Sequence, residues 1–148
     1  NKKLTLAAGG RYVYSKKADY NGREKLIDKN YYEIETAVAY QINSDLSISG
    51  GYTFGNWSVM PGYQTDVDFW TNSHTLAIGG QYVFSEKIEV NLGVLRSKFS
   101  NQTITYTHTP VPAPTPFPSV ATSEFTNEYS KDALIFAIGM DIHLNRKK

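Results

Sequence analysis

The chain has 148 residues, about the length of one domain, and its formal net charge at neutral pH is +1. It contains no cysteine, which excludes disulfide bonds and cysteine-ligated metal sites. Charged residues make up only 20% of the chain, which argues against an electrostatic nucleic-acid binder. The 11 tyrosines and 11 glycines suit an antiparallel β protein, and no apolar run approaches the length of a membrane-spanning helix.

Six stretches place large apolar side chains at even numbers and small or polar side chains at odd numbers. A period of two over about ten residues predicts β-strands, and ten residues are enough for a tilted strand to cross a bilayer. The predicted strands cover 4–15, 31–42, 46–56, 74–84, 88–99 and 132–144. We expect no helix longer than two turns.

The connections between these strands alternate between long and short. Long loops are predicted near 16–30, 57–73 and 100–131, and short turns at 43–45 and 85–87. Asn21 and Gly22 form a turn signal in the first loop. The third loop contains the proline-rich run T-P-V-P-A-P-T-P-F-P, which cannot pair in a sheet. We therefore expect 107–126 to be mobile and dispensable.

In an antiparallel pair of strands, the residue numbers of two opposed residues always add up to the same sum. When that sum is even, even-numbered residues face even-numbered residues, so the large apolar side chains of both strands lie on one side of the sheet. Both short turns satisfy this rule by pairing Ile42 with Leu46 and Phe84 with Ile88. Bacterial outer-membrane barrels have short periplasmic turns and long external loops. The fold class predicted is all-β: an antiparallel up-and-down meander of about six long strands, part of a transmembrane β-barrel. Even positions would face lipid and odd positions the lumen.

Aromatic residues lie near both ends of the predicted strands. Aromatic girdles of this kind flank the apolar band of membrane barrels. The candidates are Tyr14, Tyr32 and Phe54 at the outer rim, and Tyr40, Tyr82 and Phe84 at the inner rim.

The strings H-T-L-A-I-G-G-Q-Y-V-F-S-E-K-I-E-V-N-L-G-V (74–94) and A-L-I-F-A-I-G-M-D-I-H-L (133–144) resemble the C-terminal end of the FadL/TodX family. The likeness covers roughly Tyr31 onward. It implies a non-enzymatic outer-membrane channel that takes up hydrophobic small molecules such as long-chain fatty acids or hydrocarbons. The family barrel has about fourteen strands and an N-terminal plug. Residues 1–148, which begin at Asn1 without a signal peptide, would therefore be its C-terminal segment, with the remaining strands and plug upstream.

Two groups of residues are candidates for function. The lumen-facing polar side chains are Arg11, Glu33, Glu35, Gln81, Asn91 and Asp141. Glu33 and Glu35 suggest acid–base chemistry, but we favour charges paired with Arg11 or wetted by water. The candidate hydrophobic ligand contacts in the loops are Trp57, Met60, Phe69, Trp70 and Phe117. Packing of the loops on one another is the competing interpretation.

Lipid partners are also predicted. Lys16, Lys17, Arg96 and Lys98 lie near the outer rim, where they would pair with lipopolysaccharide phosphates or remain solvated. No catalytic or phosphate-binding motif is present, and His74, His108 and His143 share no metal-ligand spacing, so we expect no cofactor and no metal. Alternative functions are a structural or adhesive outer-membrane barrel and a soluble β-barrel that binds a hydrophobic ligand.

Overall fold

The computed structural model describes residues 3–65, 68–108 and 122–144, and this part of the chain is all-β. No helix within it is long and apolar enough to cross a membrane, and its helices are three short 3₁₀ turns. The strands are β1 (Leu4–Val13), β2 (Ile27–Gln41), β3 (Leu46–Val59), β4 (Ser73–Ser85), β5 (Ile88–Phe99), β6 (Gln102–His108), β7 (Ser123–Tyr129) and β8 (Asp132–Ile142). The 3₁₀ turns are η1 (Ser15–Lys17), η2 (Arg23–Leu26) and η3 (Pro61–Tyr63).

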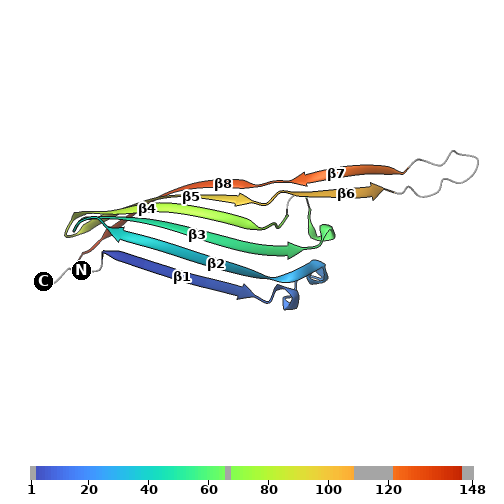
Figure 1. Cartoon of the computed structure of the whole chain (residues 1–148), viewed down its shortest axis with the longest axis horizontal. Helices are drawn as coiled ribbons and strands as arrows, with labels where there is room; N and C mark the ends of the chain where they lie inside the picture. Colours follow the sequence, from blue (N-terminus) through green and yellow to red (C-terminus); the bar gives the residue numbers. More distant parts are fainter. Residues whose placement is uncertain (1–2, 66–67, 109–121, 145–148) are drawn as a thin grey trace, which may run out of the picture.

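Six strands form one antiparallel sheet in the order β1-β2-β3-β4-β5-β8, while β6 and β7 form a separate hairpin (Figure 1). The predicted six-stranded meander is therefore confirmed, as an open sheet rather than a closed barrel. The three long connections leave one end of the sheet, which we call the long-loop end. The opposite end, the short-turn end, carries both short turns, the start of β1 and the end of β8. The β6–β7 hairpin continues the direction of β5 and β8 beyond the long-loop end.

The strands pair in the register that the sequence predicts. Apart from local bulges, every pair in the main sheet joins two residues of equal parity. The first short turn is confirmed: the Ile42 N–H donates to the Leu46 carbonyl at 2.9 Å. The Asn43 Oδ1 accepts from the backbone N–H groups of Asp45 and Leu46, each at 2.9 Å. Side-chain acceptance of this kind explains why asparagine begins the turn.

The second short turn corrects the prediction. Ser85, not Phe84, pairs with Ile88, after a register shift between Val83 and Ser85. The bulge absorbs one residue of β4, which leaves a two-residue turn of Glu86 and Lys87.

The long loops are shorter and more ordered than predicted. β2 begins at Ile27 and β3 continues to Val59, and the first loop contains η1 and η2. The Asn21-Gly22 turn is confirmed, because both residues have positive φ. The structureless loop predicted over 100–131 is wrong: it contains β6 and β7, whose threonine and aromatic residues favour strands. Residues 109–121, the centre of the segment expected to be mobile, lie outside the described residues, together with Phe117.

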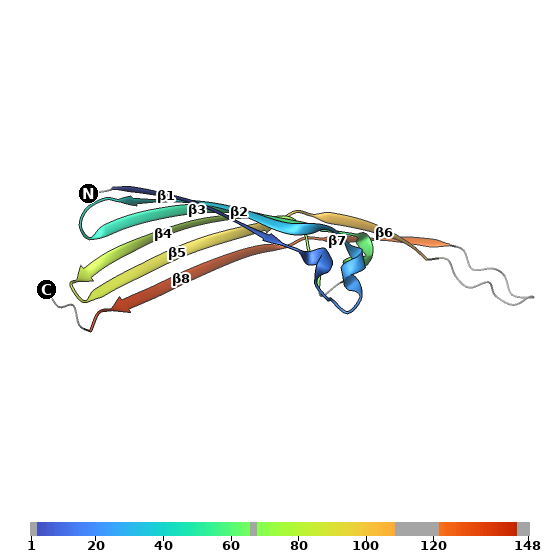
Figure 2. The same ribbon diagram turned by 90° about the horizontal axis from the view of Figure 1, so that it is seen from below.

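The sheet is curved, and its two faces differ (Figure 2). We call the even-numbered side chains of the six strands, from Tyr32 onward in β2, the even face, and the odd-numbered ones the odd face. Even-face residues such as Leu76, Phe136 and Ile138 are exposed, with Ile138 at 81%. Odd-face residues of β4 are partly covered, and a Cβ added at Gly9 would lie 2.6 Å from Glu35 Oε1. Side chains therefore crowd together on the odd face and spread apart on the even face.

The buried apolar residues lie at the long-loop end rather than within the body of the sheet. Among the described residues they are Ile27, Tyr31, Tyr63, Ile104 and Tyr129. This small core joins β2 to η3 and to the β6–β7 hairpin. Large apolar side chains along the sheet itself are left on its outside, which reverses the arrangement of a soluble sandwich.

Candidate functional site

Aromatic rings from two strands and one loop stack together at the long-loop end. Tyr31 of β2 and Trp57 of β3 lie with ring centroids 4.0 Å apart and nearly parallel. Trp57 also contacts Trp70 at 4.2 Å, and Trp70 contacts Tyr63 of η3 at 5.0 Å. Tyr31 and Trp57 are at odd positions, so this aromatic stack lies on the odd face. Pairs of this geometry contribute about 0.5–1.5 kcal/mol beyond their buried area.

Hydrogen bonds fix the position of Trp70. Its indole N–H donates to Asp68 Oδ1 at 2.7 Å, and its backbone N–H and carbonyl each bond the Gln64 side chain at 2.8 Å. Asp68 also forms an ion pair with Arg23 at 3.0 Å, and Arg23 lies 4.2 Å from the centre of the Tyr63 ring. Burial raises the pKa of the Tyr63 hydroxyl, and Arg23 opposes this shift. Arg23 of the first long loop therefore holds Asp68 and Tyr63 of the second long loop in position.

Beside this stack is a cavity of about 530 Å³. Its walls come from β3, the loop before β4, the end of β5 and the connection between β7 and β8. The lining residues are Trp57, Asp68, Phe69, Trp70, Thr71, Phe99, Ser130 and Lys131. Four aromatic rings with a few polar groups form the lining expected for a small-molecule site.

Two polar groups in this cavity suit a ligand with a polar end. The Thr71 hydroxyl is buried and has no hydrogen-bond partner among the described residues. It also lines a neighbouring cavity of about 200 Å³ that shares Trp57 and Trp70. The Lys131 ammonium lies 4.7 Å from the centre of the Phe99 ring and is in none of the ion pairs between described residues. A buried hydroxyl without a partner favours occupation by a polar atom.

The structure brings together three of the five predicted loop contacts. Trp57, Phe69 and Trp70 line one cavity, whereas Met60 is 42% exposed and lies outside its lining. The sequence reasoning missed Thr71, Phe99, Lys131 and the supporting Tyr31. Tyr31 and Phe99 are large aromatic residues at odd positions of predicted strands, which the alternation assigns to small or polar side chains. That violation of parity was the available signal.

The predicted polar residues of the odd face form separate pairs. Arg11 and Glu33 lie 3.4 Å apart, as predicted, and the Tyr31 hydroxyl also donates to Glu33. Glu35 does not pair with Arg11; its carboxylate lies over Gly9, where no side chain obstructs it.

Near the short-turn end, Asn91 donates to Asp141 at 2.8 Å and Gln81 to Glu89 at 2.7 Å. His143, expected to be isolated, is 3.2 Å from Glu89. Sequence reasoning missed the role of Glu89, which joins Gln81 and His143 into one network.

No three His, Asp or Glu side chains in the described part of the chain are placed to hold a metal ion. Glu33 and Glu35, the pair considered for acid–base work, point to different partners. The candidate site that the structure does contain is the aromatic cavity. No family model, curated protein or solved structure matches the chain.

Proposed function

We propose that the chain is the C-terminal part of a bacterial outer-membrane barrel that takes up hydrophobic small molecules. In this proposal the even face contacts lipid, the odd face lines the lumen and the aromatic cavity receives the ligand at the external mouth. The observation that carries the proposal is the exposed apolar face, because monomeric soluble proteins rarely expose large contiguous apolar surfaces.

The dimensions of the even face support a membrane position. Along β4, the ring-bearing residues His74 and Phe84 are ten positions apart and enclose Leu76, Ile78 and Tyr82. Ten residues span about 34 Å of strand, or about 25 Å in height at a tilt of roughly 40°. That height equals the apolar band of outer-membrane barrels. Tyr32 and Phe54, 6.1 Å apart, continue the aromatic rim at the long-loop end.

The open edges support the proposal that further strands complete the wall. β1 and β8 are the two edges of the sheet, and β8 is exposed along most of its length. An exposed edge of this length attracts other strands unless it is paired. Upstream strands of the same protein would pair there, and a plug would lie against the odd face, as in the FadL/TodX family. Membership of that family is part of the proposal.

The two tryptophans of the chain provide a direct test of the ligand site. Trp57 and Trp70 both line the cavity, so tryptophan fluorescence reports on it without labelling. We expect a bromine-substituted long-chain fatty acid to quench the protein's fluorescence saturably in detergent micelles. Phe69→Ala should weaken binding about tenfold, because burial of an aromatic side chain contributes about 1.5–3 kcal/mol.

Met60→Ala is the matched control, because Met60 belongs to the same loop region and lies outside the cavity lining. It should leave the quenching curve unchanged. Quenching that never saturates, or that is equal for Phe69→Ala and the unaltered protein, would remove the cavity from the proposal.

An adhesive barrel is the second candidate, and the projecting β6–β7 hairpin favours it. Phe125 of that hairpin is 52% exposed and stacks on Tyr106 with ring centroids 5.3 Å apart. Exposed aromatic residues are common in protein–protein contacts. Removal of the hairpin tip separates the two functions, because adhesion needs the exposed tip and the aromatic cavity does not include it. A soluble binder, the third alternative, would stay monomeric without detergent.

A further inference from the structure

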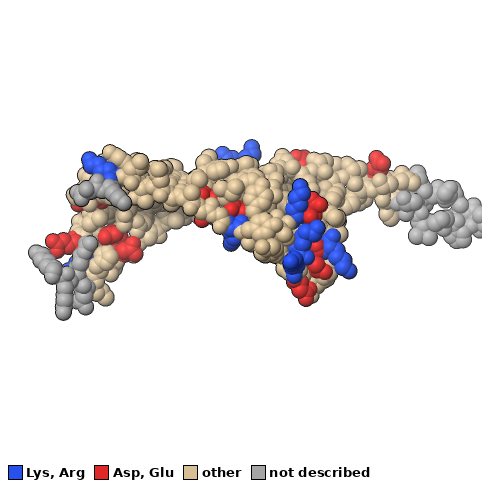
Figure 3. Space-filling view, turned by 60° about the horizontal axis from the view of Figure 1, so that its bottom comes forward, with Lys and Arg blue, Asp and Glu red and all other residues tan. Residues whose placement is uncertain are grey.

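The charged side chains of the even face gather in one place, together with one histidine. Along the six strands this face carries Arg96, Lys98, Asp132 and His74, all at the long-loop end of β4, β5 and β8. The register puts His74, Lys98 and Asp132 in one row across the three strands, with Arg96 one step nearer the centre of the sheet. Elsewhere, charged side chains crowd onto the projection formed by the first loop (Figure 3). The even-face group is therefore a distinct cluster.

This cluster has excess positive charge. Arg96 binds Asp132 through Nε and Nη2, the latter at 2.6 Å from Oδ2, which leaves Nη1 without a partner among the described residues. Lys98 is exposed and forms no ion pair within the described residues. His74 is 2.7 Å from the Tyr52 hydroxyl, which fixes the position of its ring. One negative charge thus faces two permanent positive charges.

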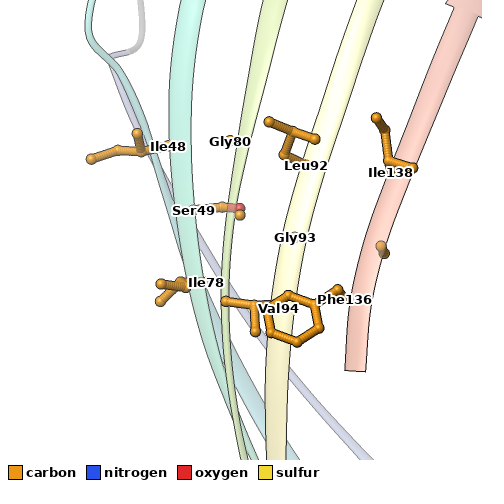
Figure 4. A pocket seen from close by; sticks show the side chains of 11 residues that line it. Ile48, Ser49, Ile78, Gly80, Leu92, Gly93, Val94, Phe136 and Ile138 are labelled. Carbon is orange, nitrogen blue, oxygen red and sulfur yellow. The ribbon is translucent and has the colours of Figure 1, made fainter. Parts of the chain in front are cut away.

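A shallow apolar groove of about 710 Å³, whose lining side chains are drawn in Figure 4, begins two residues along β5 from this cluster. Val94 lies two residues along β5 from Arg96, and Leu92 lies two residues further. Both side chains line the groove. Gly80 lies in the same row as Ile48 and Leu92, and its missing side chain opens the groove between them. Phe136 and Ile138 of β8 line the groove on the side away from Ile48 of β3.

We propose that this cluster and groove form a binding site for one phosphorylated, acylated glycolipid of the lipid A type. The phosphate contacts Lys98, His74 and the outer side of Arg96, and one acyl chain lies in the groove over Val94 and Gly80. The inference rests on the proposed function, which places the even face against lipid and the long-loop end at the outer surface of the outer membrane. It identifies a particular site for the predicted lipopolysaccharide partner.

Charge and position favour this lipid over others. A phosphate group complements the excess positive charge, and arginine and lysine are its usual ligands. The cluster lies at the long-loop end, which faces outward in outer-membrane barrels. The outer leaflet there consists largely of phosphorylated glycolipids.

Two pairs of matched variants test the two halves of the site. Lys98→Gln removes the unpaired cation without disturbing the Arg96–Asp132 ion pair, and Lys87→Gln removes the same charge at the short-turn end of β5. Gly80→Leu fills the groove, and Gly50→Leu fills a neighbouring groove of about 440 Å³. A Cβ at either glycine meets only a backbone oxygen, at 3.6 Å, which is an ordinary contact distance, so neither Cβ crowds the sheet.

Binding of purified lipid A to the protein in detergent micelles is measured by native mass spectrometry. Lys98→Gln should weaken it roughly fivefold, the effect expected for one lysine near a charged lipid surface. Gly80→Leu should weaken it as much, while Lys87→Gln and Gly50→Leu leave it unchanged. Equal effects within either pair would overturn the proposal, and equal binding of phosphatidylglycerol would show that the lipid is a phospholipid instead.

Lipid-soluble quenchers applied to labels on the even face distinguish failure of this lipid site from failure of the proposed membrane function. Labels that are quenched without lipid A binding refute this site alone, and labels that are not quenched refute the proposed function as well.

Discussion

At the residue scale, Leu92 and Asn91 separate the two faces of the sheet. They are neighbours in β5, so the pleat points their side chains in opposite directions. Leu92→Arg puts a charge near the middle of the apolar band and should cost roughly 2–4 kcal/mol. Asn91→Arg should cost much less, because Asn91 already bonds Asp141 on the polar side, at 2.8 Å. Urea unfolding in lipid vesicles measures both changes, and equal losses would contradict the assignment of faces.

Sequence reasoning predicted individual residues where a simple rule applies. Parity placed Leu92 and Asn91 on opposite faces, and it paired Ile42 with Leu46 correctly. It found Trp57, Phe69 and Trp70 because large aromatic residues in loops are unusual. It missed Thr71 and Lys131, because a threonine or lysine in a loop carries no such signal. Their importance depends on which strands the fold brings together.

At the scale of elements, the β6–β7 hairpin has a base and a tip with different roles. At the base, Gln102 contacts Gln64 and Tyr129 contacts Phe69, so the base supports the cavity. Beyond the Ile104–Asn127 pair, the two strands continue to pair with each other, Thr105 with Thr126 and Tyr106 with Phe125. The alternation of threonine with isoleucine and tyrosine was readable as a strand. The prediction extended the effect of the nearby prolines to the whole loop. Proline excludes strand pairing only at its own position, so the residues on either side of the proline-rich run could still form strands.

Replacement of residues 105–126 by Asn-Gly tests this division. A two-residue Asn-Gly turn closes a hairpin between Ile104 and Asn127, which are paired in the register. We expect the free energy of unfolding to fall by only about 0.5–1.5 kcal/mol, the contribution of one hydrogen bond, because the removed part includes the Tyr106 hydroxyl that contacts Tyr129. Ligand quenching of Trp57 and Trp70 should be retained. Loss of quenching would place the tip within the ligand site, and loss of cell adhesion with uptake intact would favour the adhesive function.

At the scale of the whole molecule, the sheet has two faces and no core between them. Alternation in the sequence predicts the strands, their order and the side to which each residue points. It does not determine whether the apolar side meets lipid or protein, since both give the same period. Curvature adds information that the sequence lacked: crowding at Gly9 and Gly79 shows that the odd face is the concave one. In a barrel the concave face is the lumen.

Accessibility of single cysteines decides what covers the even face, and the cysteine-free chain is a clean background. The even-face variants are Leu76→Cys, Ile78→Cys, Val90→Cys, Leu92→Cys, Phe136→Cys and Ile138→Cys, and the odd-face variants are Ala77→Cys, Asn91→Cys and Ala137→Cys. Gly79 is omitted because a Cβ there would lie 3.1 Å from Ser49 Oγ. In membranes, a lipid-soluble quencher should reach spin or fluorescent labels on the first set and not on the second. A water-soluble thiol reagent should favour the second set. Equal protection of both sets from the lipid-soluble quencher would mean that protein covers the even face, and the membrane position and hydrophobic uptake would both be wrong.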